Sequence, residues 1–182
     1  MPCTVFFALA AVALFATPAL AQDAEVWPVP EISSDLSLLP EPVRAKREAL
    51  IAAARSGDIE ALRPIMEAQE HPPTVSYGGP DDAVAYLKGT SEDEKGHQIL
   101  GLLLDLLDQP YAYFPDGEGT TYYVWPYLAE LDLATLTPEQ TVDAYRLLDA
   151  DQLTELQELQ AWYYWRVFIS NTGEWTAFVA GD

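Results

Sequence analysis

One apolar stretch constrains the fold of this chain more than any other part of its sequence. Between Asp93 and Leu107, seven aliphatic side chains cover most of the circumference of a helix. A helix that is apolar on nearly every side has to be buried among other elements. After Pro110 the apolar spacing changes from the helical period to the alternation of a β-strand. The sequence therefore predicts a mixed protein in which a central helix over 93–107 precedes a sheet.

Further patterns complete the predicted fold. Residues 43–67 have the apolar spacing of a helical hairpin, and Thr137 begins a capping box with proline at the first helical position. Residues 111–125 and 162–179 each alternate around a glycine-containing turn and are predicted to form β-hairpins. Four antiparallel strands need a helical layer on one face. We expect an α+β fold in which the helical hairpin and the central helix cover the sheet, with an element order similar to cystatin or nuclear-transport-factor folds.

Residues 1–21 have the features of a cleavable export signal. Residues 5–16 are almost wholly apolar, and Ala19-Leu20-Ala21 places small residues before the polar Gln22. The apolar stretch is shorter than the roughly 20 residues that cross a bilayer. The first four residues contain no Lys or Arg, which departs from the usual basic start of such signals. We expect cleavage after Ala21 and a periplasmic or secreted protein that is not embedded in the membrane. The alternative is a buried N-terminal helix.

Cleavage at that position divides the chain into three parts and removes its only cysteine. Residues 22–42 are rich in proline and are expected to form an exposed leader, and residues 43–182 are expected to form a single domain. Because Cys3 lies inside the signal, the mature chain has no disulfide, no thiol nucleophile and no cysteine ligand for zinc. A domain of this length can be stabilised by its hydrophobic core instead.

The charge balance excludes some partners and favours others. The chain has 29 Asp and Glu against 9 Lys and Arg, for a formal net charge of −20, and none of these residues lies in 1–21. Nucleic acid and anionic membrane surfaces are repelled by such a chain. Cationic proteins, basic peptides and divalent cations are attracted. The alternative is that the charge only keeps an exported protein soluble.

No common catalytic or cofactor-binding motif is present. The sequence lacks the Gly-x-Ser-x-Gly elbow, the P-loop, the dinucleotide fingerprint, His-Glu-x-x-His and the EF-hand loop, and we expect no cofactor. The strongest polar pattern is the helical stripe of His97, Asp105 and Asp108 on the central helix. These groups could bind a divalent cation or serve a small hydrolase or metal-dependent enzyme. The alternative is that the stripe is the solvent-facing side of the helix.

Aromatic residues gather in the predicted sheet. Trp162, Tyr164 and Arg166 alternate onto one face of their strand, and Arg166 marks that face as the outer one. Trp125 and Trp175 are expected to extend it. Exposed rings rimmed by acids could bind a cationic protein, a peptide or an envelope glycan, or form a homodimer interface. The alternative is a two-sided aromatic core covered by helices.

Three short motifs in the second half of the chain resemble a family. They are Val124-Trp125-Pro126-Tyr127, Gly173-Glu174-Trp175 and Phe178-Val179-Ala180-Gly181-Asp182. With them, most of the mature chain resembles small exported bacterial proteins of unassigned function. The resemblance implies a location and a fold, and no activity. Taken together, the sequence favours a non-enzymatic binding or interaction domain outside the cytoplasm, with the enzyme based on His97, Asp105 and Asp108 as the alternative.

Overall fold

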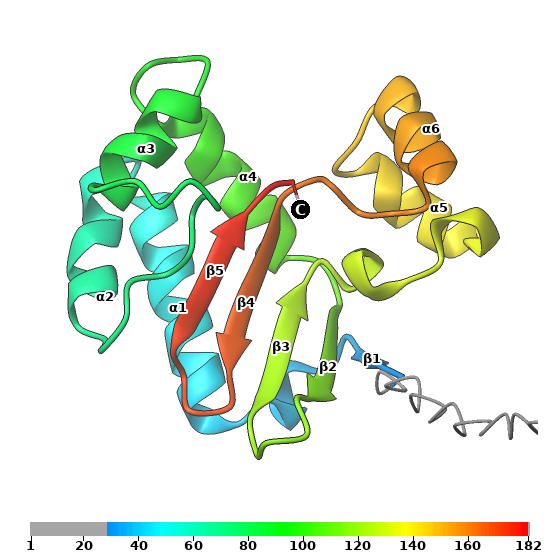
Figure 1. Cartoon of the computed structure of the whole chain (residues 1–182), viewed down its shortest axis with the longest axis horizontal. Coiled ribbons are helices and arrows are strands. Elements are labelled where there is room, and N and C mark those ends of the chain that lie inside the picture. Colours follow the sequence, from blue (N-terminus) through cyan, green and yellow to red (C-terminus); the bar gives the residue numbers. More distant parts are fainter. Residues whose placement is uncertain (1–28, 182) are drawn as a thin grey trace, which may run out of the picture.

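A computed structural model describes residues 29–181, and it combines an antiparallel sheet with six α-helices within that range (Figure 1). The predicted export signal lies outside the described residues. The five strands are hydrogen-bonded in the order β1-β2-β3-β4-β5. The strands are β1 (Glu31–Ser33), β2 (Tyr111–Pro115), β3 (Thr121–Trp125), β4 (Arg166–Ser170) and β5 (Trp175–Val179). The helices are α1 (Glu41–Arg55), α2 (Arg63–Glu67), α3 (Ala83–Thr90), α4 (His97–Leu107), α5 (Pro138–Tyr145) and α6 (Ala150–Leu159). The α+β prediction is confirmed.

The main core lies between one face of the sheet and the helices that separate β1 from β2. Helices α1 and α4 pack on each other and on β4, and both lie behind the sheet in Figure 1. Leu103, Leu106 and Leu107 of α4 have no exposed surface, as expected for a helix that is apolar on nearly every side. The strands contribute alternate side chains to this face, among them Trp125 and Trp175, which are also fully buried.

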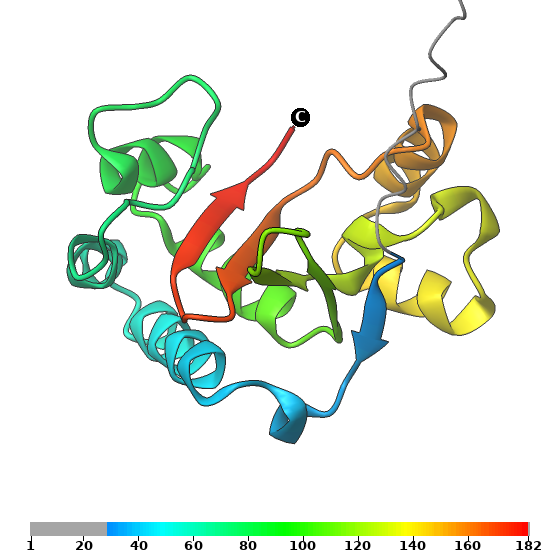
Figure 2. The same ribbon diagram turned by 60° about the horizontal axis from the view of Figure 1, so that its bottom comes forward.

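A second core is formed by the long connection between β3 and β4. Helices α5 and α6 and two short 3-10 helices before them lie together at one end of the sheet (Figure 2). Their apolar side chains form a separate buried cluster. Both α-helices begin with a capping box: Thr137 pairs with Gln140, and Asp149 pairs with Gln152. The side-chain oxygen of each cap satisfies a backbone N–H that has no helical partner. No helix among residues 29–181 is both long enough and apolar enough to span a membrane.

The expected leader over 22–42 is mostly exposed in its described part, but it pairs with the sheet and belongs to the domain. Glu31–Ser33 form the edge strand β1, and Glu31 pairs with Tyr113 of β2. The hydroxyl of Tyr111 donates to the carbonyl of Asp35 at 3.0 Å, and Leu39 is buried in the main core. The domain therefore begins before residue 43, and the sheet has five strands where four were expected.

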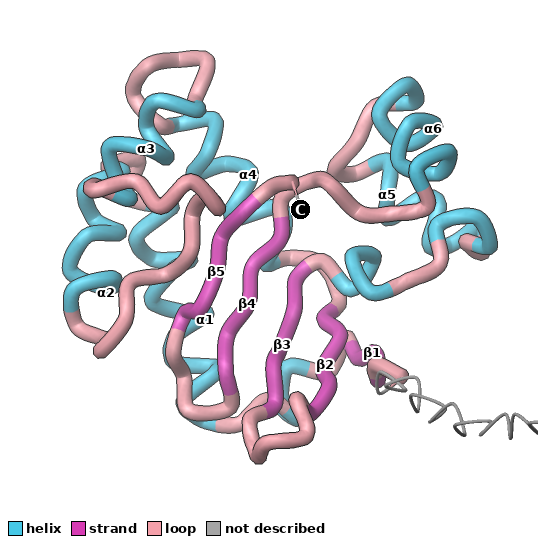
Figure 3. Tube along the Cα trace, in the orientation of Figure 1, coloured by secondary structure: helices cyan, strands magenta, loops and turns pink. Residues whose placement is uncertain are grey.

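The two edges of the sheet differ. A long loop runs from α2 to α3 and passes beside β5 (Figure 3). In it, Thr74 makes a parallel bridge to Ala177. The Thr74 N–H donates to the Thr176 carbonyl, and the Phe178 N–H donates to the Thr74 carbonyl, both at 2.9 Å. This bridge covers the β5 edge and fixes the position of the loop.

Candidate functional site

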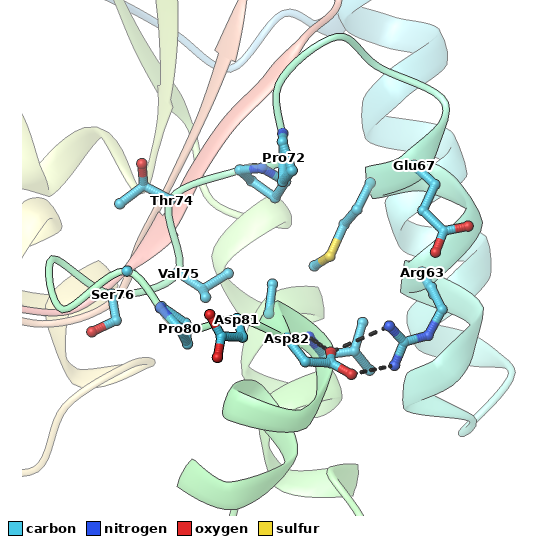
Figure 4. Close-up of a pocket in the computed structure, with 14 residues that line it drawn as sticks. Arg63, Glu67, Pro72, Thr74, Val75, Ser76, Pro80, Asp81 and Asp82 are labelled. Carbon is cyan, nitrogen blue, oxygen red and sulfur yellow. Dashed lines mark hydrogen bonds and ion pairs between the residues drawn. The ribbon is translucent and has the colours of Figure 1, made fainter.

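A cleft lies between α2, the loop of residues 72–82 and the first turn of α3 (Figure 4). Its volume is about 430 Å³. Three side chains that are almost fully buried, Met66, Val75 and Val84, form its apolar floor. Three prolines of the loop, Pro72, Pro73 and Pro80, also line it, and no aromatic residue does. The cleft can therefore accommodate aliphatic groups but has no ring on which a sugar could stack.

The loop holds its shape through local hydrogen bonds and the bridge to β5. The Gly79 N–H donates to the Ser76 carbonyl at 3.1 Å, and Gly79 has a φ of +60°, a conformation that glycine adopts without strain. At the end of the loop, Asp82 is the N-cap of α3 and accepts from the N–H groups of Val84 and Ala85, both at 3.0 Å. The walls of the cleft are therefore fixed at both ends of the loop.

Arg63 connects the two walls. Its Nη1 and Nη2 donate to the two carboxylate oxygens of Asp82 at 3.2 and 3.1 Å, and its Nε donates to Glu60 at 2.8 Å. The backbone N–H of Ala85 and the Arg63 guanidinium lower the pKa of Asp82, and hydrogen bonds to Glu60 and Asp82 raise the pKa of Arg63. All three nitrogens of the guanidinium donate to Glu60 or Asp82. Arg63 is the only cation among the described residues that line the cleft, so its charge is already balanced by protein carboxylates.

Two further carboxylates remain at the rim. Glu67 on α2 and Asp81 in the loop lie on opposite sides of the cleft and are both exposed (Figure 4). Within residues 29–181, neither forms an ion pair or a side-chain hydrogen bond. The lining thus contains one paired cation and three carboxylates. Such a site favours an ammonium or guanidinium group over an anion.

The predicted metal residues do not form one site. His97 is the first residue of α4, where its Nδ1 lies 2.9 Å from Asp93 Oδ2, and Asp108 is paired with Arg146 at 2.6 Å. Asp105 is eight residues from His97, which corresponds to about 12 Å along the helix axis. Among the described residues, no three His, Cys, Asp or Glu side chains are grouped so that they could hold a metal ion. All three predicted residues are exposed, as the solvent-facing alternative expects.

Asp105 and Asp108 do line a second hollow, of about 530 Å³, between α1 and α4. Arg47 and Arg55 line it as well, and His97 does not. Arg47 donates through Nε and Nη2 to the carbonyl of Leu107 at 3.2 and 2.7 Å, so it serves the C-terminus of α4. Three carboxylates, Glu48 among them, and two guanidinium groups line this hollow, and its apolar residues are less buried than the floor of the cleft.

The expected exposed aromatic platform is wrong. Trp125 and Trp175 are fully buried, Trp162 is only 4% exposed, and Tyr164 is half-buried. The strand begins at Arg166, so the alternation assumed from Trp162 onward does not apply; Trp162 packs in the second core. Arg166 is half-buried and donates to the carbonyls of Trp162 at 2.8 Å and Gly181 at 3.0 Å. It connects chain segments within the fold.

The cleft was not predicted from the sequence, although one signal pointed to it. Two proline- and glycine-rich groups, Pro72-Pro73 and Gly78-Gly79-Pro80, lie close together between two helices and mark a long ordered loop. Asp81 and Asp82 follow this loop directly. No local pattern places Glu67 across from Asp81, because the two residues belong to different elements.

No protein-family model, curated protein or solved structure matches this chain. The resemblance to small exported bacterial proteins and the similarity in element order to cystatin or nuclear-transport-factor folds therefore stay predictions.

Proposed function

We propose that this protein is an exported, acidic binding domain without catalytic activity, and that its cleft takes a short segment of a cationic protein or peptide. One observation carries this proposal. Glu67 and Asp81 have no partner among the described residues and lie on opposite sides of a cleft with an apolar floor.

The side chains of Lys and Arg match this arrangement. Each has a long aliphatic stem that can lie on apolar surface while its charged head stays near water. In the cleft, the stems would contact the prolines and the floor, and the heads would meet the rim carboxylates. A volume of about 430 Å³ lies within the usual range of small-ligand sites, so the cleft suits a few side chains of a partner.

The charge of the whole chain supports the same class of partner. A net charge of −20 attracts basic proteins over long distances and raises their association rate. An envelope glycan is the weaker candidate, because no aromatic residue lines the cleft and Trp125, Trp162 and Trp175 are buried. The proposed location outside the cytoplasm rests on the signal-like sequence of residues 1–21.

The test is calorimetric titration of residues 22–182 with an acetylated and amidated tetralysine peptide at low salt. The double variant Glu67→Gln/Asp81→Asn should bind at least tenfold more weakly, which corresponds to about 1.4 kcal/mol. The matched control is Glu48→Gln/Asp105→Asn, which removes the same charge from the second hollow. It should change the affinity little. An equal loss in both variants would show that only net charge attracts the peptide and would contradict the proposal.

A further inference from the structure

We infer that the open edge of β1 is a second interaction surface, which accepts an extended segment of a basic partner protein as an added strand. This inference is independent of the cleft. It rests on the contrast between the two edges of the sheet, on the exposed apolar residues around β1, and on the local charge.

The two edges differ in what covers them. The β5 edge is covered by the Thr74 bridge, and Pro72 and Pro73 have no N–H for further pairing. In the part of the chain that the structure describes, only β2 pairs with β1. An edge strand uses only one side of its backbone in the sheet, so the other side presents unpaired N–H and C=O groups.

Exposed apolar side chains are concentrated around this edge. Val29 is 87% exposed, Ile32 43%, Leu36 37% and Leu38 66%. These are four of the nine large exposed apolar residues of the described chain, and they fall within ten consecutive positions. Single exposed apolar residues are ordinary, but a group of them indicates a contact surface.

The edge is held in place before any partner arrives. Glu31 accepts a hydrogen bond from the Tyr113 hydroxyl, Tyr111 donates to the Asp35 carbonyl, and Leu39 anchors the following residues in the core. A strand that is already ordered loses little conformational entropy when another strand pairs with it. Tyr111 and Tyr113 thus hold β1 in a position in which another strand can pair with it.

The local charge selects the occupant. From Val29 to Val43 the chain contains Glu31, Asp35 and Glu41 and no Lys or Arg. A second copy would bring these acids together, and each copy would have a net charge of −20. Like charges on neighbouring strands are destabilising, and opposite charges are favourable. A basic strand therefore fits this edge better than a second copy does.

The test uses residues 22–182 with Glu67→Gln/Asp81→Asn, so that binding in the cleft is weakened. The probe is an acetylated and amidated hexapeptide of alternating valine and lysine, and its control is the same peptide with N-methyl groups on alternate residues. Hydrogen exchange and calorimetric titration are the readouts. We expect the probe to bind and to slow amide exchange in Glu31–Ser33, and N-methylation to weaken binding at least tenfold. Such a result would hold whether or not the cleft binds tetralysine.

The matched variants place the site on the molecule. Ile32→Lys should weaken probe binding at least tenfold, because it puts a cation on the edge. Val142→Lys, a change of the same kind at an exposed residue of α5, should have little effect. Absence of binding, equal binding of the N-methylated peptide, or equal loss in both lysine variants would overturn the inference. A doubled mass in sedimentation without peptide would overturn it as well and assign the edge to a second copy.

Discussion

Gly96 is a residue whose identity the fold constrains strongly. It has a φ of +89° at the start of α4, and a Cβ at this position would overlap with the side chain of Ile59. A left-handed conformation disfavours any residue with a Cβ, and the adjacent core residue leaves no room for the methyl group. The sequence Lys95-Gly96-His97 therefore determines where α4 begins.

We predict that Gly96→Ala lowers the free energy of unfolding by about 2–4 kcal/mol, from left-handed strain and overpacking together. Gly89→Ala is the control. Gly89 lies in α3, and the methyl group of an alanine there would meet no heavy atom within 4 Å, so this substitution should be neutral or stabilising. The gain should be at most about 1 kcal/mol. Urea unfolding measures both. Equal effects of the two substitutions would contradict this account of Gly96.

Asp93 is the second residue that fixes the start of α4. Its carboxylate accepts from the Ser91 hydroxyl and from the N–H groups of Gly96 and His97, both at 3.1 Å. These bonds, the one from Ser91 first, lower the pKa of Asp93 to about 2. The ordinary pKa of an unfolded Asp is about 3.9. The stabilisation is therefore complete above about pH 4 and is lost as the pH falls through about 2.

The corresponding experiment compares the wild type with Asp93→Asn by urea unfolding from about pH 5 to about pH 2. The wild type should be the more stable at about pH 5, and its advantage should shrink steadily toward about pH 2, because only the ionised carboxylate makes the full set of bonds. An advantage that does not change with pH would show that the Asp93 charge contributes nothing to the start of α4.

At the scale of elements, helix α6 depends on its first residues. The side chain of Asp149 accepts from the Gln152 N–H at 2.8 Å, and the Gln152 side chain accepts from the Asp149 N–H at 2.9 Å. Asp149→Ala should lower the free energy of unfolding by about 1 kcal/mol, the usual effect of losing an N-cap. Asp151→Ala in the same turn removes the same charge without removing the cap. Thermal unfolding of the two variants separates the effects, and equal losses would assign the effect to charge.

The elements that could be predicted from the sequence are those with a strong local pattern. Helix α4 has an unbroken apolar surface, the hairpin of β2 and β3 alternates around a turn, and α5 opens with a capping box. Strand β1 could not be predicted, because Glu31–Ser33 have no periodicity and their partner in β2 lies about 80 residues further along the chain. Its existence depends on a long-range pairing that no local pattern records.

The candidate site was less predictable than the fold for a related reason. A stripe at helical spacing places His97 and Asp105 on one side of α4, but side chains two turns apart do not converge on one atom. The cleft instead combines Glu67 from α2 with Asp81 from a loop, and no sequence pattern sets a register between these two segments. The class of partner is predicted from composition alone, through the excess of acidic residues, and it stays a prediction.

At the scale of the whole molecule, the two proposed surfaces lie at opposite edges of the sheet. The cleft is built on the loop that bridges β5, and the open edge belongs to β1 (Figure 1). Three strands separate β1 from β5, so one partner segment at each surface would not compete with the other. The arrangement is consistent with the proposal that basic partners bind at two separate surfaces, both within a strongly negative field.

The most direct test of the central claim is an NMR titration of isotope-labelled residues 22–182 with acetylated and amidated tetralysine, at low salt. The account predicts that the largest amide shifts fall in residues 63–67 and 72–84, the segments that surround the cleft, and that they diminish as salt is added. Shifts spread evenly over the acidic surface, or largest in the hollow between α1 and α4, would contradict it.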